Sequence, residues 1–184
     1  MNKNSKVKGN KKVDQTGQET MDVDSPFAIV GIGFGAHSLT PLQIFFSNLP
    51  AQPNVCFVLL SSPIDSHPNN LEAALKSESK FPIVHAVDGQ ALITNTIYLT
   101  PEDKEIGIHQ RRLLFLEPRQ AKESRMRIDH FFESLANDQG ALSVGIIFSG
   151  IGTDGETGIR MIKEKFGMTM SQQLEPLAYH SPAA

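Results

Sequence analysis

Two glycine-rich turns are the segments of this sequence best suited to bind a ligand. Residues 31–36 read GIGFGA, and residues 150–155 read GIGTDG. Both fit the pattern G-x-G-x-x-(G/A), in which glycines let the backbone approach a phosphate at a helix N-terminus. A nucleotide-binding module is therefore one hypothesis, and glycines that only permit tight turns are the other interpretation.

The rest of a dinucleotide site is missing around these turns. Such a site needs an acidic residue after the second strand to hold the ribose hydroxyls, whereas residues 59–63 read LLSSP. Asp154, at the tip of the second turn, would also repel a pyrophosphate. The sequence therefore predicts no cofactor.

Hydroxyl, imidazole and carboxylate groups near the turns could instead hydrolyse an ester. This chemistry needs an oxygen nucleophile and a base that takes its proton. Ser38, His67 and Asp154 form such a set if the loops bring them together, although Ser38 also suits the N-terminal cap of a helix. The remaining histidines are scattered without metal-ligand spacing, so no metal site is predicted; they include His85, His109, His130 and His180.

Alternating strands and helices must position these groups. Apolar runs predict strands over residues 27–33, 55–60, 83–84, 97–99, 144–148 and 168–170, and a hairpin over 106–109 and 113–116. Helical spacing of apolar residues predicts helices over residues 39–46, from about 66 past Leu75, over 128–138 and over 156–165. This alternation favours an α/β domain with a mostly parallel sheet, whose strand-to-helix turns lie along one edge.

Composition and charge place the chain among soluble cytoplasmic proteins. The chain has 184 residues and a formal net charge of -3, which predicts one domain over residues 26–184 and gives no sign of nucleic-acid binding. Residues 1–25 are polar and contain several lysines, so we expect a disordered tail. Cys56 lies in an apolar run and suits the core. No apolar stretch approaches the ~20 residues that cross a bilayer, so membrane insertion is not expected.

Several segments resemble the catalytic domain of CheB-type chemotaxis methylesterases. They are residues 29–33 (IVGIG), 45–50 (FFSNLP), 88–89 (DG), 128–136 (IDHFFESLA) and 145–155 (GIIFSGIGTDG). Residues 128–140 most resemble the version fused to a methyltransferase in sensory hybrid proteins. The resemblance covers about residues 27–182 and implies a doubly wound, Rossmann-like sheet with helices on both faces and one antiparallel hairpin.

The resemblance also implies where a catalytic site would lie. CheB-type enzymes hydrolyse glutamyl methyl esters on chemoreceptors with a Ser-His-Asp triad. Asp154 matches the triad aspartate, whereas Gly35 stands at the serine position and Ser62 at the histidine position. The implied pocket comprises Gly33, Phe34, Ala36, His37, Ser38, Ile151 and Thr153. His37 and Ser38 replace two further glycines of the family turn, which would narrow the mouth of this pocket.

The missing side chains decide the expected function. Glycine offers no nucleophile and serine is no base near neutral pH, so hydrolysis should be lost. We expect a binding or regulatory module whose partner is a chemoreceptor or signalling domain, with a methyltransferase domain in the same polypeptide as one candidate. An active esterase using Ser38, His67 and Asp154 is the alternative from the enzyme class. Because the family domain normally continues past residue 182, this chain could be truncated at its C-terminus.

Overall fold

Six parallel strands form the central sheet in the computed structural model, which describes residues 26–62, 71–118, 126–148 and 151–172. The strands run in the spatial order β3-β4-β2-β1-β7-β8. Their bounds are Ala28–Phe34 (β1), Val55–Ser61 (β2), Ile83–His85 (β3), Ile97–Leu99 (β4), Ser143–Ile147 (β7) and Met168–Ser171 (β8). A separate antiparallel hairpin joins β5 (Glu105–His109) to β6 (Arg112–Leu116).

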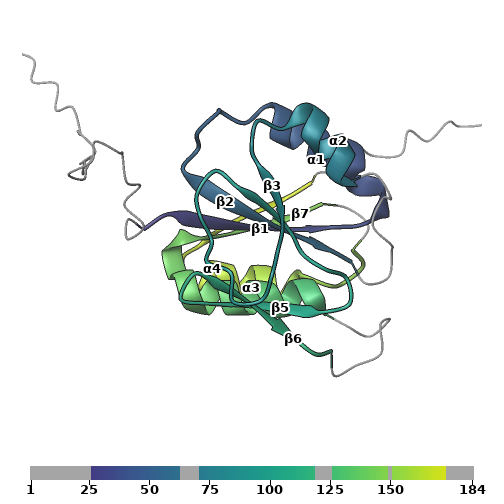
Figure 1. Ribbon diagram of the computed structural model, residues 1–184. Helices are drawn as coiled ribbons and strands as arrows, with labels where there is room; N and C mark the ends of the chain where they lie inside the picture. The colour runs from purple at the N-terminus through teal and green to yellow at the C-terminus, as the bar shows by residue number, and fades with distance from the viewer. Residues whose placement is uncertain (1–25, 63–70, 119–125, 149–150, 173–184) are drawn as a thin grey trace, which may run out of the picture.

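Helices cover both faces of the sheet (Figure 1). On one face lie α1 (Leu39–Ser47), which follows a 3₁₀ turn over Ala36–Ser38, and α2 (Leu71–Glu78). On the other face lie α3 (Arg127–Gln139), followed by a 3₁₀ turn over Gly140–Leu142, and α4 (Glu156–Glu164). The hairpin packs beside α3 on this second face.

Each face of the sheet has its own apolar core because strand side chains alternate between the two faces. The α1 and α2 side buries residues such as Ile32, Leu42 and Phe57, and the α3 and α4 side buries Ile29 and Phe132 among others. Cys56 is a free, buried thiol of the second core, as its apolar surroundings in the sequence predicted.

The predicted α/β class, the parallel sheet and the antiparallel hairpin are confirmed. Most element boundaries shift by one or two residues from the predicted ones. The predicted helix start near residue 66 lies outside the described residues, as do the tail over residues 1–25 and the C-terminal end, so the domain boundaries stay a prediction. Among the described helices, none combines the length and apolar character that spanning a bilayer requires.

Two glycines of the first motif are needed for close packing of α3 on β1. A Cβ atom added at Gly31 would lie 2.7 Å from Phe132 Cε1, and one added at Gly33 would lie 2.8 Å from Ile128 Cγ2. Such contacts are too short for any real side chain. The sheet and α3 therefore explain these glycines without a bound phosphate.

Candidate functional site

The predicted site residues lie at or just after the carboxyl ends of three neighbouring parallel strands, β1, β2 and β7. β1 lies between β2 and β7, with Phe34 opposite Ser61 and Gly33 opposite Ile147. Because these strands are parallel, the turns that follow them begin side by side at the carboxyl edge. The chain passes from β1 through α1 to β2, but from β7 through α4 to β8 on the other side. The boundary between β1 and β7 is therefore the topological switch point, where open α/β sheets bind ligands.

The first turn is closed by its own backbone and by Ser38. Gly35 is buried, and its N–H donates to Ser38 Oγ at 3.3 Å, while the Ser38 N–H donates to the Gly35 carbonyl at 3.1 Å. Ser38 stands at the N-cap position of α1 as predicted, but its hydroxyl makes no capping bond to that helix. It faces back to Gly35 instead and is 0% exposed, whereas His37 is exposed.

Ser62 follows β2 next to this turn. It is 1% exposed, and its N–H donates to the Phe34 carbonyl at 2.8 Å. This bond ties the end of β2 to the end of β1, so the positions of Gly35 and Ser62 start from adjacent strand ends. The structure therefore brings together the two positions that the resemblance assigns to the nucleophile and the base.

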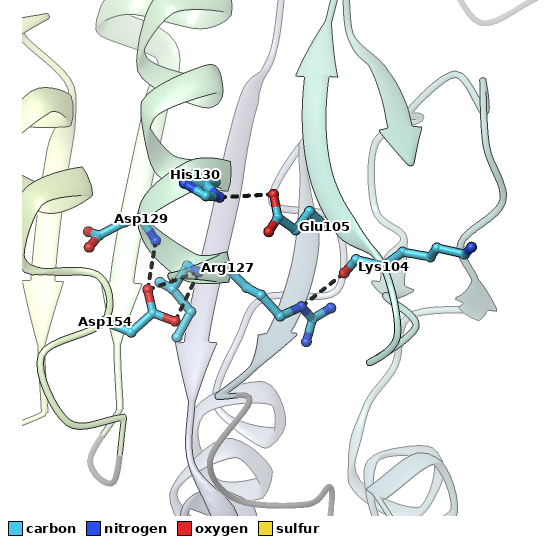
Figure 2. Close-up of polar contacts among 7 residues, drawn as sticks. Lys104, Glu105, Arg127, Asp129, His130 and Asp154 are labelled. Atoms are coloured by element: carbon cyan, nitrogen blue, oxygen red, sulfur yellow. Dashed lines mark hydrogen bonds and ion pairs between the residues drawn. The ribbon is translucent and has the colours of Figure 1, made fainter. Parts of the chain in front are cut away.

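Asp154 of the second turn binds the first turn of α3 (Figure 2). Its Oδ1 accepts hydrogen bonds from the N–H groups of Ile128 and Asp129 at 3.1 and 3.0 Å, and its Oδ2 lies 3.2 Å from the Ile128 nitrogen. Burial raises the pKa of this carboxyl, although the two N–H groups oppose the shift. Asp154 is thus a capping residue for a helix that lies far from it in the sequence.

Arg127 is a buried cation that sequence reasoning missed. Its guanidinium donates to the carbonyl oxygens of Lys104 at 3.0 Å, Ser61 at 3.1 Å and Pro101. The side chain is 0% exposed, which is rare for arginine unless its donors are satisfied. Arg127 therefore connects the start of α3 to the end of β2 and to the segment between β4 and β5.

The predicted pocket residues fall into two groups. Ile151, Thr153 and Asp154 line a pocket of about 440 Å³ between β7, α4 and β8. The other predicted residues belong to β1 and the first turn and do not line this pocket; they are Gly33, Phe34, Ala36, His37 and Ser38. His67 lies outside the described residues. Within the described ranges, no cluster of three or more His, Cys, Asp or Glu residues could hold a metal ion.

The raised pKa of Asp154 predicts a pH dependence of stability. Because burial raises the pKa of this carboxyl, the folded chain binds its proton more tightly than the unfolded chain does. Stability from this titration is complete below the usual aspartate range and is lost as pH rises through the folded-state pKa. Asp154→Asn removes it, so the wild-type free energy of unfolding should fall relative to that of the variant over this window. Urea unfolding between pH 3 and 7 measures the wild-type free energy of unfolding minus that of the variant. An increase of this value with pH would contradict the burial argument.

Residues 30–181 match the family model of the CheB methylesterase. The chain belongs to the CheB methylesterase family. The family resemblance of the sequence segments is thereby confirmed, while the closer resemblance to hybrid proteins and the roles of single site residues stay predictions.

Relatives of this CheB domain carry names that describe an enzyme. The chain is 32% identical over 159 residues to protein-glutamate methylesterase/protein-glutamine glutaminase 3 of Pseudomonas aeruginosa, which covers 85% of this chain and 47% of that protein. It is 24% identical over 160 residues to the protein of the same type from Nitrosospira multiformis, covering 86% and 45%. The chain therefore spans about half the length of these relatives.

A solved CheB structure shares the fold. The crystal structure of the Thermotoga maritima CheB methylesterase catalytic domain superimposes with a TM-score of 0.68 over 79% of each chain, at 22% sequence identity. This likeness confirms the doubly wound sheet that the resemblance implied.

Proposed function

We propose that this CheB-family domain binds a partner in sensory signalling and does not hydrolyse methyl esters. One feature carries the proposal: the resemblance assigns the family serine to the position of Gly35 and the family histidine to the position of Ser62. These positions begin at adjacent strand ends, joined by the bond from the Ser62 N–H to the Phe34 carbonyl. Without an attacking hydroxyl and a base, a serine hydrolase typically loses about 10⁶-fold in turnover.

The burial of Ser38 argues against a rearranged catalytic set. A nucleophile must reach the ester carbon, yet Ser38 is 0% exposed and its oxygen accepts a hydrogen bond from the Gly35 N–H. The carboxylate of Asp154 is likewise engaged, by the N–H groups of Ile128 and Asp129. Using both groups in catalysis would require the first turn and the start of α3 to open.

The glycine packing argues against the nucleotide-binding alternative. Gly31 and Gly33 lie in β1 under the side chains of Phe132 and Ile128, so their missing Cβ atoms make room for α3. A phosphate-binding role is not needed to explain them.

The partner class follows from the family. The proposed partner is a cytoplasmic chemoreceptor segment or a signalling domain, and a methyltransferase domain of the same polypeptide is one candidate. A binding surface is still available at the carboxyl edge of the sheet. It is formed by the strand ends, the two turns and the capped start of α3. Regulation of chemotaxis by binding, in the cytoplasm, is therefore the proposed role.

Methanol release tests the proposal. The chain is incubated with a methylated chemoreceptor fragment, and the Pseudomonas aeruginosa relative serves as the active control. We expect methanol release at the rate of buffer alone and saturable binding of the same fragment in a titration. Catalytic release of methanol that disappears in a Ser38→Ala variant would support the rearranged esterase, and absence of binding would contradict the proposed partner.

A further inference from the structure

A second pocket lies between the hairpin and α3, on the face of the sheet that carries α3 and α4. Its volume is about 710 Å³. Apolar walls come from Ile106, Leu116 and Pro118, and titratable side chains come from Glu105, Glu117 and His130. None of these residues belongs to the glycine turns, so the pocket is independent of the proposed function.

Glu105 gives this pocket a carboxylate that is largely removed from water. Its side chain is 11% exposed, and its Oε2 lies 3.2 Å from His130 Nδ1, on the facing side of α3 (Figure 2). Among the described residues, no other side chain pairs with Glu105. Two other carboxylates of the described surface have more partners: Asp138 accepts two backbone N–H groups, and Glu72 pairs with both Lys76 and His85.

Glu117 adds a second carboxylate at the rim of the pocket, where Lys104 balances its charge. Its side chain is 83% exposed and lies 2.5 Å from Lys104 Nζ. Apolar walls with carboxylates beside them match a lysine side chain, whose methylene stem contacts apolar surface while its ammonium reaches the charge.

The chain itself contains a basic segment that suits this pocket. Residues 1–12 carry five lysines and no acidic residue; the lysines are Lys3, Lys6, Lys8, Lys11 and Lys12. The described chain begins beside the hairpin, because the guanidinium of Arg111, in the hairpin turn, lies 5.4 Å from the centre of the Phe27 ring.

The chain between the lysines and the described residues is long enough to reach from the hairpin turn to the pocket. β5 has 5 residues, so the hairpin extends roughly 17 Å from its turn towards the pocket. Residues 13–25 can span at most ~45 Å when extended. The lysines can therefore reach the pocket without displacing any described element. We propose that the lysine-rich segment 1–12 docks in the pocket formed by the hairpin and α3, with a lysine ammonium on Glu105.

Paramagnetic broadening tests the contact in the full chain. A nitroxide is attached to a Ser5→Cys variant, and labelling is selective because Cys56 is fully buried and burial raises the pKa of its thiol. We expect the amide signals of Ile106, Gly107 and Ser134 to lose at least half their intensity. Replacing the five lysines by glutamine should abolish this loss. Broadening confined to another surface, or unchanged by the lysine replacements, would overturn the proposal.

Charge variants and a matched control locate the contact. Glu105→Gln should weaken docking about tenfold. Glu117→Gln should weaken it at least about twofold, and this exposed position tolerates the change without a risk to folding. Glu133→Gln makes the same charge change at an exposed position of α3 outside the pocket and should leave the broadening unchanged. Insensitivity to Glu117→Gln and Glu105→Gln would contradict the assigned pocket. Broadening of a ¹⁵N-labelled chain by a separate spin-labelled chain would show that the occupant is a second copy, which also overturns the proposal.

Discussion

Replacing Arg127 with methionine should lower the free energy of unfolding by about 4 kcal/mol, because several buried carbonyl oxygens lose a charged donor at once. The guanidinium donates to the carbonyl groups of Ser61, Pro101 and Lys104, and the side chain is 0% exposed. Methionine retains most of the stem volume, so the loss reports mainly on the polar contacts. Urea denaturation monitored by circular dichroism measures it.

Two further variants separate the role of the planar guanidinium donors of Arg127 from that of its positive charge. Arg127→Lys retains the charge but not the planar set of donors, so an intermediate loss is expected. Arg160→Met removes an exposed arginine of α4, which lies 3.8 Å from Glu156, and should change stability by less than ~0.5 kcal/mol. A similar small effect for Arg127→Met would show that the guanidinium does not hold the strand ends together.

Replacing Asp154 with alanine should lower the free energy of unfolding by about 3 kcal/mol, because two backbone N–H groups at the start of α3 lose their acceptor. The Ile128 and Asp129 N–H groups both donate to this carboxylate, which is 4% exposed. Asp154→Asn retains one acceptor oxygen and should lose less. Chemical denaturation measures the global effect.

Hydrogen exchange gives the local evidence for the Asp154 cap. The amide protons of Ile128 and Asp129 should exchange faster in Asp154→Ala than in the wild type. Asp103→Ala, at an exposed position before β5, is the matched control and should stay within ~0.5 kcal/mol of the wild type. Unchanged exchange at Ile128 and Asp129 would contradict the capping role.

The fold could be predicted because its core strands are short apolar runs between turn residues. The segments 55–60 and 144–148 are examples, and β2 and β7 differ from these predictions by one residue at most of their ends. The hairpin is predictable as well, because charged residues separate its two apolar strands. The adjacency of Gly35 and Ser62 follows once β1 and β2 are parallel neighbours.

The polar contacts of the site could not be predicted in the same way. Asp154 and Ile128 are 26 positions apart, so their bond depends on how α3 packs and not on a local pattern. One signal was available: a helix that leads to a parallel strand begins at the carboxyl edge, where the second turn also lies. Arg127 gave no signal, because a charged residue usually lies on the surface even beside apolar neighbours such as Met126 and Ile128.

Covalent trapping tests most directly whether this CheB domain has an attacking hydroxyl. The chain is incubated with a fluorophosphonate, and its intact mass is measured beside that of the Pseudomonas aeruginosa relative. We expect no added mass on this chain, because Gly35 has no side chain and Ser38 is buried against the Gly35 N–H. A stoichiometric adduct mapped to Ser38 or Ser62 would contradict it.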